Sequence, residues 1–220
     1  MDRTALNLEE TRAMLLHVAQ GMVASKDLLT QADKAIGDGD HGVGMARGFE
    51  AVEQKLAGQA FADLGELVRA TGTALMTSVG GAAGAVFGSL FGGGAKGLAG
   101  REAFGAPELH RLLADGLEAV QARGQAKPGD KTMVDALEPA ARAAAQVTGA
   151  PLNQALGVAE AAARDGMERT KEMVATVGKA KTLGERSLGH ADPGAISLVL
   201  ILKFMAEFAA GEGTQNDVAR

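Results

Sequence analysis

Three aspartates lie close together in a glycine-rich stretch near the N-terminus. Asp38 and Asp40 alternate with glycines in the sequence AIGDGDHGVG (35–44), and Asp33 precedes Asp38 by five residues. Crowded carboxylates repel one another and raise each other's pKa unless a positive charge lies between them. A hard divalent cation such as Mg²⁺, Ca²⁺ or Mn²⁺ prefers all-oxygen ligands of this kind. The spacing therefore indicates a metal site, and the alternative is a solvated turn whose carboxylates cap the next helix.

The glycines of the same stretch have the G-x-G-x-x-G spacing of phosphate-binding loops. The dinucleotide-binding loop follows a strand, and the preceding LLTQADKAI is not typical of one. The P-loop pattern is absent, and an EF-hand starting at Asp38 would need Glu where this chain has Phe49. We therefore expect the aspartates to bind metal, the metal to bind phosphate, and the glycines to leave room for a nucleotide. His41 could bond a phosphate or ribose oxygen, or cap the next helix.

A second glycine-rich stretch, GGAAGAVFGSLFGGG (80–94), has a glycine at every fourth position. These glycines are Gly80, Gly84, Gly88 and Gly92. On a helix they would form a smooth stripe, and since glycine costs a helix about 1 kcal/mol relative to alanine, the repetition indicates a steric need. For most of the stripe we favour close packing of a neighbouring helix. At its start, residues 80–83 could offer free N–H groups to phosphate.

Two further polar segments could face a ligand. GDKTMVDAL (129–137) reads as a turn leading into a helix, in which Lys131 or Thr132 could reach a ligand; a capped surface helix is the alternative. GKAKTLGERSLGHADPGA (178–195) is a long loop before an apolar helix. Its Arg186 could clamp phosphate oxygens with two hydrogen bonds, although the composition is equally that of a solvated loop.

The apolar pattern is helical along most of the chain. Asn7 and Glu10 have the spacing of a capping pair, and apolar residues then recur at helical spacing to Val23. Further helices are expected at about 44–56, 61–79, 107–122, 131–147, 152–176 and 194–211. Aromatic residues make up only 3% of the chain and β-branched residues do not alternate, so we predict no strand. An all-α fold in one domain, 1–220, follows.

The composition excludes several classes of protein. There is no cysteine, so disulfides and thiolate metal sites are ruled out. A formal net charge of -5 argues against a nucleic-acid-binding surface. No signal-peptide pattern is visible, and the uncharged stretch Ala70–Ala95 carries less apolar bulk than a spanning helix usually does. We expect a cytoplasmic protein with no nucleic acid and no membrane among its partners.

Four separated segments together resemble a known family. IGDGDHG, SVGGAAG, GDKTMVDAL and LGERSLGHADPGA occur in the order and spacing of the nucleotide-binding L subunit of dihydroxyacetone kinases. The resemblance extends over nearly the whole chain. It implies a closed antiparallel barrel of eight helices with the nucleotide site at one end.

The resemblance also implies the ligands and the residues that bind them. The family's three aspartates hold two Mg²⁺ ions, which bind the phosphates of ADP or ATP; here they would be Asp33, Asp38 and Asp40. The nucleotide contacts carried over by position are His41, Gly42, Val43, Gly44, Ala82, Ala83, Gly124, Met133, Arg186, Asp192, Pro193 and Gly194. Adenine would lie against aliphatic side chains such as Met133, and Arg186 would stabilise the transferred phosphoryl group.

The family's partner is a K subunit that holds the ketose covalently on a histidine, so this chain is expected to be inert alone. In the phosphotransferase-system branch, ADP stays bound and is recharged by a phosphoprotein, and we favour this branch. The alternatives are the L subunit of a split ATP-dependent triose or tetrulose kinase, and a non-catalytic regulatory or lipid-binding barrel. A Mg²⁺-dependent hydrolase ranks lower because only His41 or His190 could serve as its base. A homodimer is one option for the assembly.

Several positions depart from the family pattern. Ala83 stands where Ser is usual and Gly44 where Asn is common, while Ala85 and Phe87 replace Pro and Tyr. Because one neutral hydrogen bond contributes only about 1 kcal/mol, nucleotide binding should survive the loss of a hydroxyl at position 83. The departures leave the donor and the ketose open.

Overall fold

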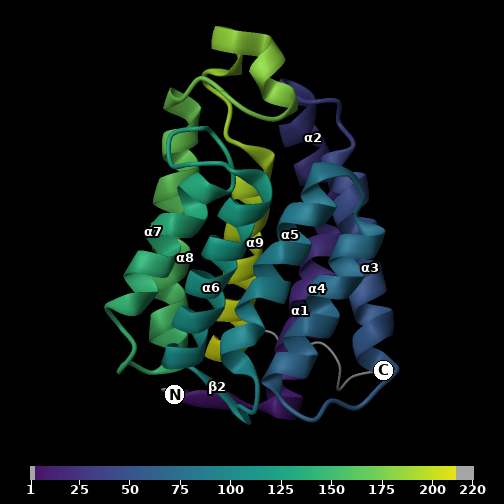
Figure 1. The fold of residues 1–220 in the computed structure, drawn as a ribbon, viewed down its shortest axis with the longest axis vertical. Coiled ribbons are helices and arrows are strands. Elements are labelled where there is room, and N and C mark those ends of the chain that lie inside the picture. The colour runs from purple at the N-terminus through teal and green to yellow at the C-terminus, as the bar shows by residue number, and fades with distance from the viewer. Residues whose placement is uncertain (1–2, 212–220) are drawn as a thin grey trace.

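The structure is a computed structural model that describes residues 3–211. Within them lie nine α-helices, three short 3₁₀ segments and two short strands (Figure 1). In chain order the elements are β1 (Ala5–Asn7), α1 (Leu8–Ala24), α2 (Lys26–Ile36), α3 (His41–Ala57), α4 (Leu64–Ser78), α5 (Gly81–Gly94), η1 (Lys96–Leu98), β2 (Ala103–Gly105), α6 (Ala106–Gly124), α7 (Val134–Ala145), α8 (Leu152–Arg169), η2 (Thr170–Glu172), η3 (Lys179–Ser187) and α9 (Pro193–Ala210). The ends of the predicted domain, residues 1–2 and 212–220, lie outside the described residues.

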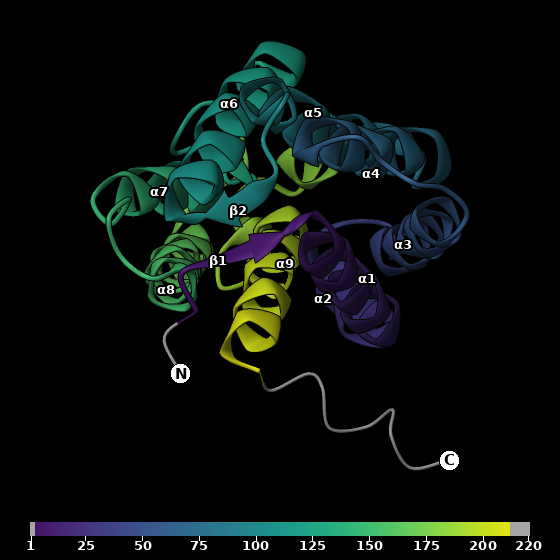
Figure 2. The same cartoon turned by 90° about the horizontal axis from the view of Figure 1, so that it is seen from below.

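Eight of the described helices follow one another around a ring. α1 packs against α3, the contacts continue through α4, α5, α6, α7 and α8 to α9, and α9 packs against α1. Figure 2 shows this ring end-on, and α2 packs mainly on α3 at one end of it. The all-α class is confirmed, and the order of neighbours agrees with the eight-helix barrel that the resemblance implies.

The first helix forms as its sequence predicts. The Asn7 Oδ1 accepts a hydrogen bond from the Glu10 N–H at 2.9 Å, and the Glu10 carboxylate accepts one from the Asn7 N–H at 2.9 Å. This reciprocal capping satisfies N–H groups that the start of a helix leaves without partners. The apolar face of α1, which includes Met14, Val18 and Met22, is buried in the core.

The expectation of no strand is wrong in one place. β1 pairs antiparallel with β2, and Leu6 lies opposite Phe104, both side chains being buried. The two strands cross the end of the barrel opposite η3 (Figures 1 and 2). Each strand has only three residues, which is too short for a repeated alternation of apolar and polar side chains to be visible.

Several helix ends also differ from the prediction, among them the start of α7 and the end of α8. α7 begins at Val134, where we expected a helix from 131, because Lys131 has a left-handed φ of 61°. α8 ends at Arg169 and continues only as the short η2, where we expected helix to 176. The polar helix α2 was not expected at all.

The glycine stripe lets α4 and α5 lie close together. A β-carbon on Gly88 would lie 2.6 Å from the Met76 β-carbon and 3.0 Å from its α-carbon, and one on Gly84 would lie 3.3 Å from the Val79 β-carbon. The packing prediction is thus confirmed for Gly84 and Gly88. At Gly92 a β-carbon would meet nothing within 4 Å, so alanine would fit there, although α4 also comes close to this glycine: a β-carbon on Gly72 would lie 2.7 Å from the Gly92 nitrogen.

The uncharged stretch Ala70–Ala95 divides into two helices, the end of α4 and the whole of α5, with a turn between them. Within residues 3–211, α9 is the one helix long and apolar enough to cross a membrane by length and composition alone. Half of that apolar stretch is buried inside the protein, as in a core helix.

Candidate functional site

A cavity of about 730 Å³ opens at the end of the barrel below η3. Its size is that of a small-molecule site, which is usually about 300–1,000 Å³. Because neighbouring helices alternate in direction, α3, α5, α7 and α9 all begin here, and their first residues line the cavity. The start of a helix carries partial positive charge, so four such ends favour an anionic ligand.

Asp33 is the most firmly held of the three aspartates. It lies in the last turn of α2 and is 8% exposed. Its Oδ2 accepts hydrogen bonds from the backbone N–H of Gly39 at 2.8 Å and of His41 at 3.2 Å. A β-carbon on Gly37 would overlap this carboxylate, and Gly39 has a φ of 79°, so the tight loop requires both glycines.

Asp38 and Asp40 are exposed and are paired with one lysine from a distant part of the chain. The Lys179 Nζ lies 2.5 Å from the Asp38 Oδ2 and 3.2 Å from the Asp40 Oδ2. Its hydrogen bond to Asp38 lowers the pKa of that carboxyl and raises the pKa of the Lys179 ammonium. The loop therefore already attracts a positive charge.

The three carboxylates fit a divalent cation. One oxygen from each of Asp33, Asp38 and Asp40 lies within 4.8 Å of the others. Since Mg²⁺ holds oxygens at about 2.1 Å, two oxygens on one ion are at most about 4.2 Å apart, and on Ca²⁺ about 5 Å. Only a small closing movement is needed. The ammonium of Lys179 lies beside two of these carboxylates, at a position that a metal cation could take.

The turn between α4 and α5 presents backbone N–H groups to the cavity. Gly80 and Gly81 have φ values of 83° and 57°, and Gly80 caps α5 without a side chain. The first N–H groups of α5 therefore have no side-chain acceptor within the described residues. Arg47 holds this turn in place, because its guanidinium donates to the carbonyls of Ser78 and Val79, both at 2.6 Å.

His41 connects α3 to α9. Its Nε2 lies 2.7 Å from the Ser197 Oγ, and the Ser197 hydroxyl donates to the Pro193 carbonyl at 3.0 Å. With that hydroxyl proton used, the arrangement requires His41 Nε2–H as the donor. Burial lowers the pKa of His41, although Asp33 and Asp40 oppose the shift, so the neutral form is favoured. His41 thus fixes the start of α3 against α9 beside the aspartate loop.

The residues that precede α7 and α9 contribute a buried polar cluster to the cavity wall. The Lys131 side chain is 2% exposed, and its Nζ donates to the carbonyls of Thr170 and His190 at 2.5 and 2.6 Å. Asp192 caps α9 by accepting from the Ala195 N–H at 2.8 Å. Removal from water raises the pKa of Asp192 to about 7, and the nearby Asp135 carboxylate adds to the rise. Through the bond of Lys131 to the His190 carbonyl, this cluster fixes the C-terminal end of the 178–192 segment at the cavity wall.

The structure brings most of the predicted site residues to this one cavity. Those that line it are Asp33, Asp38, Asp40, His41, Val43, Gly44, Ala82, Ala83, Gly124, Met133, Asp192, Pro193 and Gly194. Gly42 is not among them, because it faces α2, where a β-carbon would overlap the Lys26 carbonyl and Thr30. Arg186 is not among them either; its side chain is exposed on η3.

The predicted site omitted several residues of the cavity wall. Lys179 and Lys131 stood in segments that we noted as candidates, but neither was assigned to the site. Arg47 was missed entirely. It lies four residues after Val43 on α3, which places both side chains on the same face of the helix, and this spacing could have indicated it.

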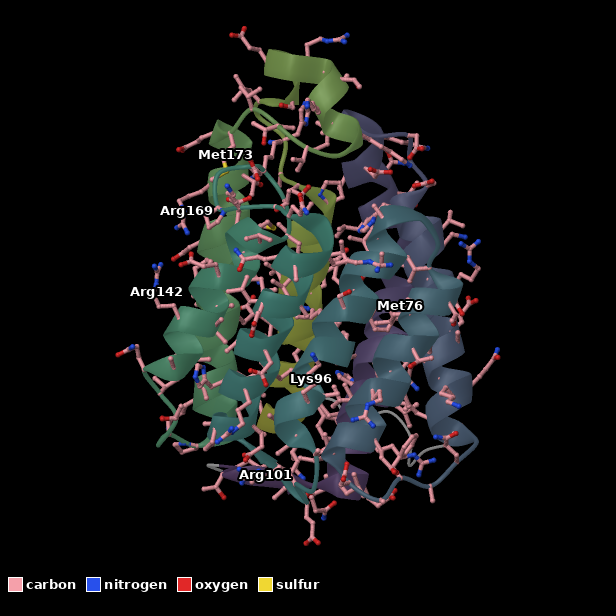
Figure 3. The ribbon with its side chains drawn as sticks, viewed as in Figure 1. Met76, Lys96, Arg101, Arg142, Arg169 and Met173 are labelled. Atoms are coloured by element: carbon pink, nitrogen blue, oxygen red, sulfur yellow. The ribbon has the colours of Figure 1, made fainter. Side chains whose placement is uncertain are left out.

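A second hollow, of about 430 Å³, lies between α7 and α8. Arg142 and Arg169 belong to its lining and extend from the side of the barrel (Figure 3). It shares no lining residue with the first cavity and contains one carboxylate, Asp165. The chemistry indicated by the sequence therefore lies in the first cavity alone.

Comparison with known proteins identifies the family. The DAK2 domain family model matches residues 35–207, which include every lining residue of the cavity except Asp33. The chain belongs to the DAK2 domain family. This DAK2 domain is 40% identical to the ADP-binding subunit DhaL of PEP-dependent dihydroxyacetone kinase from Escherichia coli (strain K12), over 82% of this chain and 87% of that subunit.

Two further relatives of the DAK2 domain are informative. The ADP-binding subunit DhaL of PTS-dependent dihydroxyacetone kinase from Lactococcus lactis subsp. lactis (strain IL1403) is 34% identical over 93% of this chain and 100% of that subunit. The crystal structure of the dihydroxyacetone kinase from C. freundii in complex with AMP-PNP and Mg²⁺ matches with a TM-score of 0.71 and 28% identity. That match covers 94% of this chain and 35% of the kinase chain, so the DAK2 domain spans about a third of its length.

The departures of this DAK2 domain from the expected pattern have local physical consequences. A β-carbon on Gly44 would lie 2.9 Å from the Val79 carbonyl oxygen, so glycine lets α3 approach the α4–α5 turn. Phe87 is buried, with its ring centroid 6.4 Å from that of His41. Ala83 lines the cavity in the first turn of α5, where backbone N–H groups are present whatever the side chain.

Proposed function

We propose that this chain is the ADP-binding subunit of a dihydroxyacetone kinase, or of a kinase for a related short ketose. It passes a phosphoryl group to the ketose held on a partner K subunit. The observation that carries the proposal is the meeting of three carboxylates with the uncapped start of α5 at one cavity. The 40% identity to an ADP-binding kinase subunit supports it.

In this proposal Asp33, Asp38 and Asp40 hold Mg²⁺, with two ions as the expected number. The bound Mg²⁺ would neutralise phosphate charge and orient the transferred phosphoryl group. The N–H groups of residues 81–83, which the Arg47-braced turn holds in place, would bind the phosphates. The apolar part of the cavity wall would receive the base, and it includes Val120, Gly124, Ala126, Met133 and Val134.

The residues of this chain act mainly by positioning, since phosphoryl transfer requires alignment and charge neutralisation more than covalent chemistry by the protein. The helix starts around the cavity supply fixed positive dipoles that need no rearrangement during transfer. Arg186 is proposed to reach the transferred phosphoryl group from η3. Since Arg186 does not line the cavity here, this role requires η3 to move when nucleotide and partner bind.

For the donor, we propose a phosphoprotein of the phosphotransferase system that recharges bound ADP in the cytoplasm. The names of the E. coli and L. lactis relatives support this choice. A split ATP-dependent kinase of a triose or tetrulose is the second candidate. It is favoured by the C. freundii kinase, which was crystallised with an ATP analogue. A regulatory or lipid-binding barrel explains the three retained carboxylates less well.

The nucleotide content of the purified protein tests the proposal. The chain would be dialysed with and without EDTA, denatured, and its supernatant separated by anion-exchange chromatography. We expect one equivalent of ADP that survives dialysis and is lost with EDTA. Reversible binding of ATP and Mg²⁺ to a nucleotide-free protein would favour the ATP-dependent kinase. Binding of neither nucleotide would reject both kinases.

The need for a partner is tested separately. The purified chain with ATP, Mg²⁺ and dihydroxyacetone should give no dihydroxyacetone phosphate, because the ketose site is assigned to another subunit. Addition of a K subunit, the phosphoryl-transfer proteins and PEP as their phosphoryl source should give turnover. Turnover by the isolated chain would contradict the assignment of the ketose site to a separate subunit.

A further inference from the structure

The strongest unexplained contact in the cavity is the one between Lys179 and the aspartate loop. Lys179 comes about 140 residues after the aspartates, at the first position of η3, and its ammonium bridges the Asp38 and Asp40 carboxylates. Lys179 also lines the cavity. Neither the metal nor the nucleotide role assigned above uses this side chain.

A metal ion and this ammonium compete for the same two carboxylates. The Oδ2 atoms of Asp38 and Asp40 are the atoms that Lys179 binds, at 2.5 and 3.2 Å. Both residues belong to the group of carboxylates that could hold a cation. A divalent cation bound there would repel the ammonium and take its place, because like charges at such short range are strongly unfavourable.

We propose that Lys179 is a built-in competitor of the metal: it occupies the carboxylates when the site is empty and must leave when the cation binds. Since Lys179 begins η3, its departure also releases η3 from the aspartate loop. Metal binding and the position of the segment that carries Arg186 are thereby coupled. This inference rests on the proposed function, because it concerns the same metal site.

The structure makes the substitution of this lysine a clean test. The Lys179 side chain is 60% exposed, so Lys179→Met should leave the fold intact. Lys179→Arg keeps the positive charge. Lys181→Met is the matched control, because Lys181 is exposed two residues further along the same segment and forms no ion pair within the described residues.

The measurement is the affinity for Mn²⁺ in the absence of nucleotide, followed by the electron paramagnetic resonance signal of the free ion. Exposed ion pairs are weak, and loss of the Lys179 ammonium frees two carboxylates for the ion, so Lys179→Met should bind Mn²⁺ about three- to tenfold more tightly than the unsubstituted chain. Lys179→Arg and Lys181→Met should stay within about twofold of it, by the same reasoning. The inference would be overturned if Lys179→Met and the unsubstituted chain bound Mn²⁺ with equal affinity, or if neither of them bound it. An equal gain in affinity in Lys181→Met would overturn it as well.

Hydrogen exchange of residues 178–187 provides the second readout. In the unsubstituted chain, Mn²⁺ should increase exchange in this segment because it displaces Lys179. In Lys179→Met the exchange should already be fast and should not respond to Mn²⁺. A segment in Lys179→Met that is as protected as in the unsubstituted chain would contradict the coupling.

The same samples with ADP added separate this inference from the proposed function. If the unsubstituted chain binds Mn²⁺ and ADP together but Lys179→Met shows no gain for Mn²⁺ alone, the competition is wrong and the nucleotide site stands. If no variant binds Mn²⁺ with ADP, the proposed function itself fails, and the competition fails with it.

Discussion

At the scale of single residues, the three candidate metal ligands are not equivalent. Asp33 is buried and accepts two backbone hydrogen bonds, whereas Asp38 and Asp40 are exposed and both pair with Lys179. A rigid oxygen and two adjustable ones suit a site that must change its cation. In the proposed metal site, Asp33 would therefore set the position of the ion, and the other two residues would close on it.

Asp192 gives a prediction for the pH dependence of stability. Its pKa is raised in the folded state to about 7, so the folded state holds a proton that the unfolded state releases near pH 4. The contribution is most favourable below pH 4 and is lost as the pH rises to about 7, by on the order of 4 kcal/mol at most. Asp192→Asn keeps the helix cap without a charge, so it should remove this loss.

The check is the free energy of unfolding in urea at pH 5 and pH 8 for both proteins without ligand. His41 acts in the opposite sense, because its lowered pKa favours the folded state as the pH rises. The difference between the two proteins cancels that effect. Equal pH dependence in Asp192→Asn and the unsubstituted chain would show that folding does not raise the pKa of Asp192.

Residue types and spacing indicated the aspartates and the glycine turn, and the family resemblance supplied most of the other predicted cavity residues; the exceptions have physical causes. The three aspartates stand close to one another in sequence, as do the glycines of the turn before α5, so each of these local patterns is visible in the sequence. The contact of Lys179 with Asp38 joins residues that are distant in the chain, and no local pattern contains it. Gly42 was assigned to the ligand by its position in the family pattern, but its place on the helix turns it toward α2.

At the scale of elements, the close packing of α4 on α5 depends on particular glycines rather than on the whole stripe. Gly88 faces the backbone of α4 at Met76, a residue that Figure 3 labels on that helix, while Gly92 faces open space. Gly80 instead forms the left-handed turn before α5. One periodic motif therefore serves as a turn at its start and as a packing surface in its middle.

Alanine substitutions should separate these roles. Gly88→Ala should lower the free energy of unfolding by about 1–3 kcal/mol, because a methyl group cannot fit against the α4 backbone. Gly92→Ala should be neutral or should raise it by up to about 1 kcal/mol, since alanine favours the helix and meets no neighbour. Urea titration of both variants is the measurement, and a similar loss in both would contradict this account.

The helices that sequence predicts best are those with a long apolar face. α1 has six buried positions at helical spacing and was expected almost in full. α2 buries only Leu29, Asp33 and Ile36, so its pattern is too sparse to distinguish it from a polar loop. The β1–β2 pair joins segments about a hundred residues apart, which periodicity does not detect.

At the scale of the whole molecule, the alternating directions of the helices concentrate partial positive charge at one end of the barrel. α3, α5, α7 and α9 begin there, and the aspartate loop adds negative charge beside them. An anion and a cation bound together therefore suit this end better than either one alone.

This arrangement predicts a mutual dependence in thermal stability. Mg²⁺ and ADP together, at about a hundred times the dissociation constant, should stabilise the protein by about 2.7 kcal/mol and raise Tm by about 5–10 °C. Either ligand alone should give a much smaller rise, and EDTA should reverse the full effect. Asp33→Asn should remove the joint rise, whereas Asp27→Asn, at an exposed position on the same helix, should keep it.

The cavity and the described ends of the chain lie on opposite sides of the barrel (Figure 1). α9 runs from the cavity to the far end over 18 residues, which is about 27 Å of helix. A ketose-binding domain joined to this one in a single chain would be attached at the end of the barrel away from the cavity. The tether would need at least about eight extended residues merely to return along the barrel. A partner that docks freely avoids that constraint on tether length.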